Sequence, residues 1–398
     1  MPDLTPDERR VRDLLEQRRD ALLEDLRLHV ALPTGQRNTT AVDETREIFG
    51  LRCERLGARL DLIPGDPAPW WLYGTDADAP VPPTLVARRT RPGRPNILIA
   101  GHLDTVHDPH GPFRTLTLSA DGQTATGPGC VDMKGGLVIA MAALEALEEA
   151  GVEVSWSFLM NSDEETGSYH SFGALQAEAR RHDLGLALEP ALPGGALATV
   201  RSGSGQFMVE TRGRSAHVGR EFTKGVSAVS AMAERLLAIA SFPEPDKGVV
   251  ANVGPLEGGA ATNAVPDRAR AWGNVRFPDP DAAKALESRF HTLATPQDAM
   301  PACDVHTSFN RPAKPLTPES ERLALAARDA AEALGQALPF ASTGGVCDGN
   351  ILQDAGLPTI DTLGVRGGGL HTPDEWIEIP SLVERSQLLA VLMMRVGA

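Results

Sequence analysis

The sequence predicts a two-domain α/β protein, in which a small α+β domain is inserted into a larger domain with a mostly parallel sheet. Three observations lead to this prediction. Strand-like and helix-like runs alternate from about residue 96 to residue 188, the pattern changes after about Ser202, and the first pattern returns after about residue 312. Alternation of this kind is typical of a mostly parallel sheet covered by helices on both faces.

The elements of the larger domain follow from the periodicity of its apolar residues. Helical periodicity covers residues 6–31 and 40–57, and a surface loop rich in Pro, Asp and Ala is expected over residues 66–83. Short apolar runs predict strands at 96–100, 152–160 and 184–188, and longer periodic runs predict helices at 135–150 and 169–181. A helix is also expected from Thr317 and Pro318 to Gly335, with a final one whose apolar face carries Leu382, Leu389, Leu392 and Val396.

The inserted domain is expected to have the order strand, helix, strand, strand, helix, strand. The corresponding residues are 206–211, 224–241, 248–253, 269–277, 280–294 and 302–308. This βαββαβ order is typical of a small α+β domain. We therefore expect the inserted domain to comprise residues 204–311, and the larger domain to comprise residues 1–203 and 312–398.

The composition restricts the classes of partner and compartment. The chain has 398 residues, of which 42% are apolar and 23% charged, and its formal net charge is −15. Nucleic acid is not expected as a partner, because neutralising phosphates requires clustered Lys and Arg. No apolar run approaches the ~20 residues needed to span a membrane. The four cysteines are far apart and no secretory signal is seen, which predicts a cytoplasmic protein without a disulfide framework.

Acidic and histidine side chains collect in five short segments, each just after an expected strand or at a junction between a loop and a helix. In open α/β sheets, ligands bind at that edge. The segments contain His102 with Asp104, Asp132, the carboxylates at 163–165, Glu189 and His371. Taken singly, each has an ordinary structural interpretation, such as a capped strand end, a helix N-cap or a solvated acidic turn.

Taken together, the five segments predict a metal site. Adjacent carboxylates repel one another, and a bound cation removes that cost. Mixed imidazole and carboxylate ligands suit zinc, with cobalt or manganese as substitutes. Two metals about 3.5–4 Å apart can share one aspartate and activate one water. A dinucleotide-binding interpretation of the loop at 127–132 is set aside, because Asp132 occupies the position of the third glycine.

The chain resembles the zinc carboxypeptidase and deacylase family that includes glutamate carboxypeptidase, acetylornithine deacetylase and succinyl-diaminopimelate desuccinylase. The matching segments, in the family's order, are GHLDTV (101–106), GPGCVDMKGG (127–136), NSDEETGS (161–168), LEP (188–190), GRSAHVG (213–219) and LGVRGGGLHTPDEW (363–376). The resemblance covers nearly the whole chain. It is strongest to the glutamate carboxypeptidase branch, because of NRPAKP (310–315) and the TGG-x-x-D segment (343–348).

The resemblance implies two zinc ions per chain and a role for each matching residue of the larger domain. His102 and Glu189 would hold one zinc ion, Glu165 and His371 the other, and Asp132 would bridge them. Glu164 would be the general base, and Asp104 would orient the His102 ring. His107, His110 and His170 lie near these segments but match no ligand position of the family.

The resemblance also implies roles for four residues of the inserted domain. His217 would reach the active site of the partner subunit in a homodimer and polarise the scissile carbonyl. Asn263 and Arg276 would contact the substrate, and Arg311 would bind its carboxylate. One departure concerns substrate preference, since Ser342 stands where the glutamate carboxypeptidase branch often has arginine.

The expected function is therefore hydrolysis of an amide bond in a small N-acyl amino acid or dipeptide, next to a free carboxylate. Within the same family, a deacetylase or a dipeptidase is an alternative. A metal-binding protein without catalysis is an alternative of another class, and the presence of Glu164 beside all five ligand residues argues against it.

Overall fold

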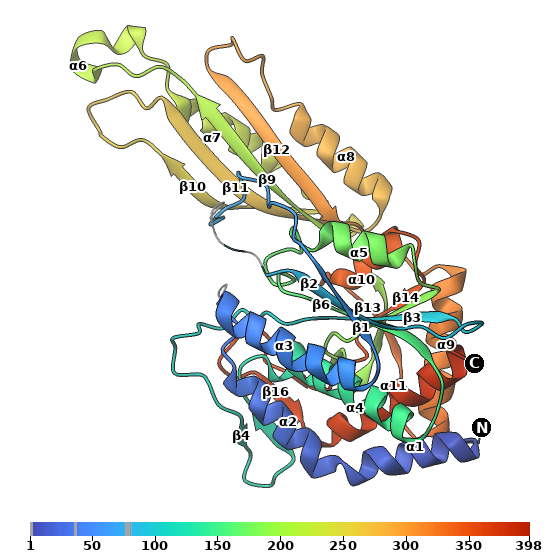
Figure 1. The fold of residues 1–398 in the computed structure, drawn as a ribbon. Helices are drawn as coiled ribbons and strands as arrows, with labels where there is room; N and C mark the ends of the chain where they lie inside the picture. Colours follow the sequence, from blue (N-terminus) through green and yellow to red (C-terminus); the bar gives the residue numbers. More distant parts are fainter. Residues whose placement is uncertain (1–2, 36–37, 76–79, 81) are drawn as a thin grey trace.

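A computed structural model describes residues 3–35, 38–75, 80 and 82–398 of the chain. Figure 1 shows a larger, layered body that contains both termini and an elongated smaller body that projects from it. The larger body is built on a six-stranded sheet with the order β1-β2-β6-β3-β7-β14. The strands are β1 (Arg59–Ile63), β2 (Thr84–Arg89), β3 (Asn96–His102), β6 (Ser155–Asn161), β7 (Leu184–Ala187) and β14 (Thr359–Ile360).

The centre of this sheet is parallel, as the sequence predicts, and one edge is antiparallel. Strands β6, β3, β7 and β14 pair in parallel, whereas β2 pairs antiparallel with both β6 and β1. The edge strands β1 and β2 were not expected. Charged residues interrupt or end their apolar runs, which are at most three residues long (Leu85 to Ala87 in β2), too short to mark a strand in the sequence.

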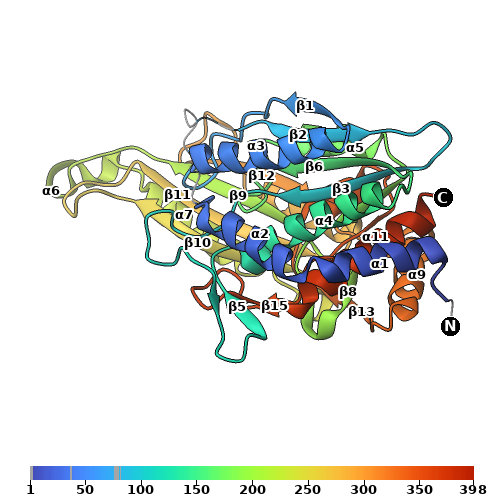
Figure 2. The ribbon, with the colours of Figure 1, turned by 60° about the horizontal axis from the view of Figure 1, so that its bottom comes forward.

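Helices cover both faces of the sheet (Figure 2). Alternate residues of β3 point to opposite faces, so Ile97 and Ile99 join one core while Leu98 and Ala100 join another. The first core is completed mainly by α1 (Pro6–Gln17), α2 (Arg19–Ala31), α3 (Thr39–Arg55), α4 (Gly135–Glu149), α9 (Pro318–Ala333) and α11 (Pro380–Val396). The second is completed by α5 (Phe172–Ala179) and α10 (Asp348–Asp354).

The helical periodicity over residues 6–31 belongs to two helices rather than one. Helices α1 and α2 meet at Arg18, whose φ of −94° and ψ of 9° interrupt the helix. The Arg18 guanidinium lies 2.5 Å from Glu149 on α4 and thereby fixes the bend against the core helix. Both helices keep an apolar face on the same core, so the periodicity continues through the break and gives no sign of it.

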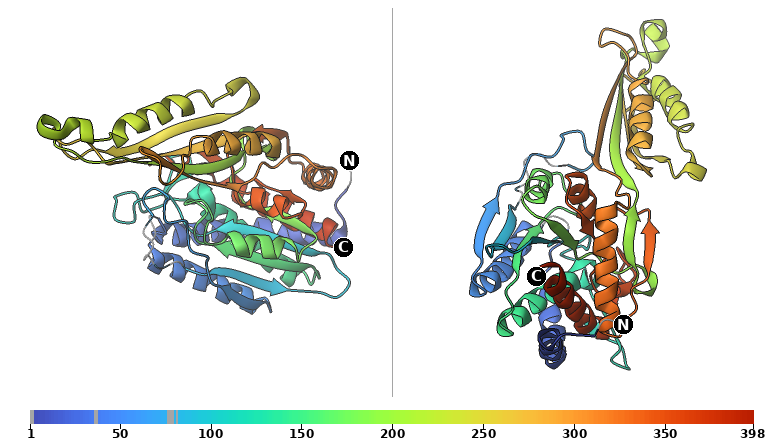
Figure 3. Two further views of the ribbon diagram at one scale, coloured as in Figure 1. Left: turned by 90° about the horizontal axis from the view of Figure 1, so that it is seen from above. Right: turned by 90° about the vertical axis from the view of Figure 1, so that its right-hand side faces the viewer.

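The smaller body, which we call the lid, has the predicted βαββαβ order. Its antiparallel sheet runs β10-β11-β9-β12. The elements are β9 (Gly203–Arg212), α7 (Ala228–Ile239), β10 (Val250–Gly258), β11 (Arg268–Phe277), α8 (Pro280–His291) and β12 (Ala302–Arg311), with a short α6 (Val218–Glu221) after β9. Both α7 and α8 cover one face of the sheet, and α6 lies at the end far from the larger body (Figures 1 and 3).

Two smaller sheets complete the larger body. Strand β8 (Leu197–Arg201) pairs in parallel with β13 (Phe340–Thr343) beside the junction with the lid. A four-stranded sheet joins β4 (Thr117–Leu118) and β5 (Thr124–Thr126) to β15 (Gly367–Gly368) and β16 (Trp376–Glu378). These strands are two to five residues long, too short for their periodicity to be recognised in the sequence.

The expected loop over residues 66–83 is a loop where it is described, whereas residues 76–79 and 81 lie outside the described residues. Part of this loop packs against the lid instead of facing solvent. Trp272 of β11 donates its Nε1–H to the Trp71 carbonyl oxygen at 2.6 Å, and Trp71 is 8% exposed. Tyr73 contacts the Trp272 ring edge-on. The loop therefore joins the two bodies through aromatic side chains.

Within the described ranges, no helix is both long and apolar enough to cross a membrane. All four cysteines are buried, and none of them forms a disulfide.

Candidate metal centre

Parallel strands bring the candidate ligands to one edge of the sheet. Strand β3 ends at His102, which pairs with Asn161 at the end of β6. The carboxylate run at 163–165 follows β6, and Glu189 follows β7 on the other side of β3. Because the carboxyl ends of these strands meet at the same edge, residues far apart in the sequence surround one point.

Asp132 lies between the two histidines. Its Oδ1 is 3.2 Å from His102 Nε2, and its Oδ2 is 3.4 Å from His371 Nε2. The same His371 nitrogen is 3.3 Å from Glu165 Oε2. Ligand atoms of His102, Asp132 and Glu165 all lie within 4.8 Å of one another, a spacing suited to a metal ion. Asp132 thus lies within reach of His102 through one carboxylate oxygen and of His371 through the other, which is the position that a carboxylate shared by two metals requires.

The candidate ligands His102, Asp132, Glu165, Glu189 and His371 are called the metal cluster below. Asp104 connects this cluster to Glu164, the expected general base. The His102 Nδ1 atom lies 2.9 Å from the Asp104 carbonyl oxygen and 3.5 Å from its carboxylate. The Asp104 carboxylate also accepts the backbone N–H groups of Glu164 and Glu165, at 3.2 and 3.0 Å. Asp104 therefore fixes the ring orientation of His102 and the backbone of the two glutamates together.

Burial and mutual repulsion shift the pKa values of the carboxylates in the cluster. Burial, with repulsion from Asp132 and Glu164, raises the pKa of Glu165 to about 7. Burial and the Glu164 charge likewise raise the pKa of Glu189 well above its ordinary value. Burial alone would raise the pKa of Asp132, but hydrogen bonds from His102 and His371 lower it overall.

These residues fit a pair of divalent cations. Glu165 Oε1 is buried and contacts no donor among the described residues. A metal would give this oxygen a partner and would offset the repulsion among the carboxylates. The donor set of two imidazoles and three carboxylates is one that zinc accepts.

Glu375 has a positional role that the sequence analysis did not assign, although it lies inside a matching segment. Its side chain is 1% exposed, and it accepts the backbone N–H groups of Gly129, Val131 and Asp132 at 2.9–3.0 Å. Its Oε2 also lies 2.5 Å from His107 Nε2. His107, which matches no ligand position of the family, thus contacts the residue that holds the Asp132 loop. Only the tertiary fold shows this, because Glu375 and Asp132 are 243 residues apart.

A cleft of about 710 Å³ lies between the metal cluster and the lid. Glu164, Glu165, Glu189 and His371 line its floor, and Arg276 lines the lid side. The Nη1 atom of Arg276 is buried without a hydrogen-bond partner among the described residues. Burial and the nearby Arg311 lower the pKa of Arg276. An unpaired guanidinium at this place can bind an anionic group of a ligand.

Arg311, which the resemblance implies would bind the substrate carboxylate, is buried where the lid joins the larger body. It is 4% exposed, and its Nη1 donates to Glu164 Oε1 at 2.6 Å. Its Nη2 donates to the Glu164 carbonyl oxygen and to Ser168 Oγ. Arg311 lines the cleft, yet it is already bound to the expected base.

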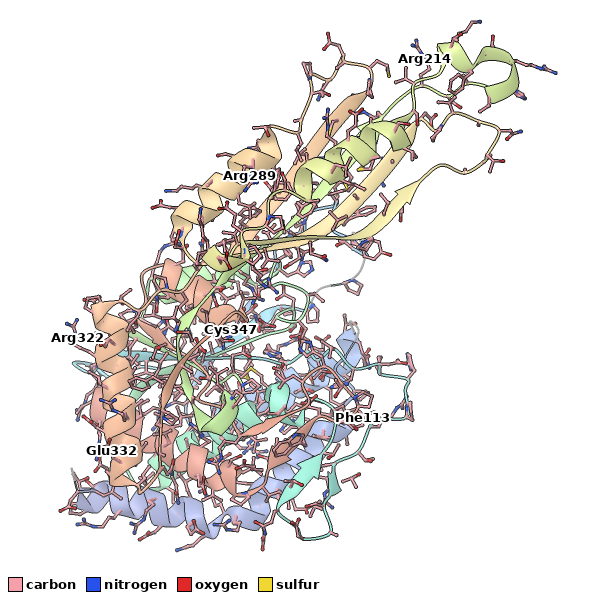
Figure 4. All side chains as sticks on the ribbon, turned by 180° about the vertical axis from the view of Figure 1, so that it is seen from behind. Phe113, Arg214, Arg289, Arg322, Glu332 and Cys347 are labelled. Atoms are coloured by element: carbon pink, nitrogen blue, oxygen red, sulfur yellow. The ribbon has the colours of Figure 1, made fainter. Side chains whose placement is uncertain are left out.

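His217 and Asn263 are near each other but away from the cleft. His217 precedes α6 and is exposed, and Asn263 accepts the Val218 N–H through its carbonyl oxygen at 3.0 Å. Figure 4 labels Arg214, three residues before His217, at the far end of the lid, whereas Cys347 lies at the junction of the two bodies. Within one chain, the structure does not bring these two residues to the metal cluster.

His110 and His170 contact no residue of the metal cluster. The His110 backbone N–H is bonded to Asp108, and His170 Nδ1 lies 2.5 Å from the Asp66 carbonyl oxygen.

Chemically, the cleft combines a site for two cations, a carboxylate that is not part of the cation cluster, and an unpaired arginine across from them. Such a set can activate water, transfer a proton and hold an anionic substrate group.

Comparisons with known proteins agree with this chemistry. Residues 98–395 match the model of peptidase family M20/M25/M40. The chain is 30% identical to carboxypeptidase G2 of Pseudomonas sp. (strain RS-16), over 77% of this chain and 75% of that protein. It is 31% identical to succinyl-diaminopimelate desuccinylase of Methylobacterium radiotolerans, over 76% and 81%.

A solved structure shows the same fold. It is a dinuclear metal-binding peptidase of Bacillus subtilis, which is 17% identical and has a TM-score of 0.66, over 96% of this chain and 99% of that one. The match of the family model to most of the chain and the identity to carboxypeptidase G2 show that this protein belongs to peptidase family M20/M25/M40, as a metallohydrolase that acts on peptide or amide bonds.

Proposed function

We propose that this protein hydrolyses the amide bond of a small N-acyl amino acid or dipeptide that carries a free carboxylate, in the manner of a glutamate carboxypeptidase. The observation that carries the proposal is Arg276, whose buried Nη1 atom has no hydrogen-bond partner among the described residues and which lines the cleft opposite the metal cluster. Burying a cation without a partner is costly, and a ligand carboxylate would remove that cost.

The proposed metal is zinc, with two ions per chain. His102 and Glu189 would hold one ion, Glu165 and His371 the other, and Asp132 both. Bound zinc lowers the pKa of a coordinated water and polarises a carbonyl group. The protein side chains then have separate tasks.

Glu164 would take the proton of the attacking water and deliver it to the leaving amine. It lines the cleft beside Glu165 but does not belong to the group whose ligand atoms converge. Asp104 supports this role, because it holds the backbone N–H of Glu164.

The proposed assembly is a homodimer in which His217 completes the site of the partner subunit. His217 is exposed and caps α6, which lies at the end of the lid far from the larger body, so a second chain could reach it there. Asn263 lies beside it and would enter the same site. Across the interface, the imidazole would stabilise negative charge on the carbonyl oxygen.

The test is a panel of N-acyl amino acids and dipeptides, each with a free or an amidated carboxylate, assayed with zinc-loaded protein. N-acyl glutamate and aspartate should be hydrolysed best, and neutral N-acetyl amino acids less well. Amidation should lower kcat/KM by about ten-fold or more, the size of a lost charge-assisted pair.

Arg276→Ala should lower kcat/KM for the free substrates to the level of the amidated ones. Arg268→Ala is the matched control, because Arg268 lies on the same face of β11 but is paired with Glu210 at 2.8 Å. Equal kcat/KM for free and amidated substrates in the wild type would exclude a carboxylate-directed hydrolase and favour a general amidohydrolase.

A further inference from the structure

The Arg311 guanidinium is fully engaged on the side of Glu164. One Nη1–H bonds Glu164 Oε1, and the two protons of Nη2 bond the Glu164 carbonyl oxygen at 2.9 Å and Ser168 Oγ at 2.7 Å. Asp348 lies 3.8 Å away and adds a second negative charge. Burial lowers the pKa of Arg311, but the Glu164 and Asp348 charges outweigh it, so that the pKa is raised overall.

In this arrangement, neither of the two-donor edges of Arg311 is free for a substrate carboxylate. A guanidinium has five N–H donors, and each edge that presents two parallel donors includes Nη2. Both protons of Nη2 are already used, and the remaining donors, Nε–H and one Nη1–H, are on different edges. Arg311 Nε is buried without a partner among the described residues, but this single N–H is one donor and not the parallel pair that a two-pronged contact needs. A two-pronged carboxylate contact would therefore require Arg311 to give up at least one of its Nη2 bonds, either to Ser168 or to the Glu164 carbonyl oxygen.

The contacts of the Arg311 side chain tie the end of the lid to the larger body. Arg311 is the last residue of β12, where the chain returns from the lid. Ser168 follows the carboxylate run of the larger body and donates its hydroxyl to Asp348 Oδ1 at 2.5 Å. Asp348 Oδ2 in turn accepts the Asn161 amide N–H at 2.7 Å. Successive hydrogen bonds thus link Asn161 at the end of β6 through Asp348 of α10 and Ser168 to Arg311, and Arg311 holds Glu164.

We propose that Arg311 is a positioning residue for Glu164, not a binding group for the substrate. Arg311 holds Oε1 and the carbonyl oxygen of Glu164 at once, so the carboxylate cannot rotate. No donor contacts Glu164 Oε2 within the described part of the chain, and this oxygen is left to accept the proton of water. The proposal rests on the proposed function, because it takes Glu164 as the base. The alternative is the carboxylate clamp that the sequence predicts for Arg311.

The two roles differ in which kinetic constant they change. A positioning residue acts on the chemical step, whereas a substrate clamp acts on binding. Arg311→Lys should lower kcat by about ten- to a hundred-fold, the order expected when a reacting group is misplaced by about 1 Å, and should leave KM within about two-fold. The loss should be the same for free and amidated substrates. Arg276→Lys should instead raise KM for the free substrate and reduce the preference over its amide.

Equilibrium binding gives a second measurement that does not depend on turnover. In the Glu164→Gln background, Arg311→Lys should leave the dissociation constant of the free-carboxylate substrate unchanged, measured by calorimetry on zinc-loaded protein. Arg276→Lys in that background should weaken binding. Arg268→Lys is the control for replacing a lid arginine by lysine. Arg268 pairs with Glu210 and does not line the cleft.

Several results would overturn the proposal. A rise in KM at constant kcat, a lost preference for the free carboxylate, or weaker binding on Arg311→Lys would show that Arg311 is a clamp. Metal content and thermal unfolding of each variant show whether it folds, and an unfolded Arg311→Lys is replaced by Arg311→Gln in the same tests. If the wild type has no metal-dependent amidase activity, the proposed function fails as well. If the wild type is active but the Arg311 variants change KM or substrate binding instead of kcat, only this inference fails.

Discussion

The Glu375 carboxylate lies 3.0 Å from the backbone nitrogen of Asp132 and accepts its N–H. The same carboxylate accepts the N–H groups of Gly129 and Val131 and contacts His107. The loop that presents Asp132, the proposed bridging aspartate, is therefore held by a side chain 243 residues further along the sequence. Partners that orient a ligand in this way strongly affect metal affinity.

Glu375→Gln should weaken zinc binding, because an amide nitrogen would face backbone N–H groups that need an acceptor. We expect about a ten- to hundred-fold loss in affinity, measured by titration against a competing chelator. Glu378→Gln is the control, since Glu378 lies in the same strand region but pairs with Arg366 at 2.6 Å. Unchanged zinc affinity in Glu375→Gln would show that the loop keeps its shape without this carboxylate.

Glu164→Gln and Glu165→Gln should separate catalysis from metal binding. Glu164→Gln should keep about two zinc ions per chain and lose about 10²–10⁴-fold in kcat, the range for removal of a general base. Glu165→Gln should lose metal, because Glu165 belongs to the converging ligand group. Metal analysis and kinetics check both, and a chelator should abolish the wild-type activity. An intact protein that binds no zinc at neutral pH would contradict the assignment of the centre.

Mixing two inactive variants should restore activity if His217 acts across a dimer. His217→Ala and Glu164→Gln each lack one group, but a mixed dimer has one site with an intact Glu164 and with His217 from the other chain. The activity of the mixture is followed while subunits exchange. A monomer that is fully active in sedimentation would contradict this prediction.

Asp361 should stabilise the junction between the bodies. It is completely buried and lies 2.8 Å from Arg201 Nη2 and 3.2 Å from Lys314 Nζ. Arg201 and Lys314 also pair through their backbones where the chain enters and leaves the lid. Asp361→Asn leaves two buried cations without their anion and should cost about 3–5 kcal/mol in the free energy of unfolding. Asp304→Asn removes only a surface pair with Arg212 and should cost at most about 1 kcal/mol.

The same carboxylate should give the stability a pH dependence. Burial raises the pKa of Asp361, but Arg201 and Lys314 lower it overall below its ordinary value. A depressed pKa means that the stabilisation is present above the ordinary value of about 3.9 and is lost as the pH falls through the lower folded value. Denaturant unfolding of the wild type should therefore weaken in strong acid more steeply than that of Asp361→Asn. Parallel curves would show that this group does not contribute.

The sequence alone determined the main layout of the fold, because that layout depends on local periodicity. Apolar runs marked β3, β6 and β7, and the change of pattern after about Ser202 marked the lid with its βαββαβ order. The strands β1 and β2 and the small sheets were missed, since they are short or rich in charge. The break at Arg18 was missed because both helices keep their apolar faces on one core.

The sequence also predicted which residues would carry the chemistry, because carboxylates and histidines at strand ends are recognisable by type and place. Only the tertiary structure decided what those residues contact. It paired Arg311 with Glu164 and bonded Glu375 to the backbone of the Asp132 loop. It also left Arg276 Nη1 in the cleft with no hydrogen-bond partner in the part of the chain that is described. The physical reason is that a side chain's role depends on which donors and charges surround it. Those neighbours come from segments hundreds of residues apart, which folding brings together.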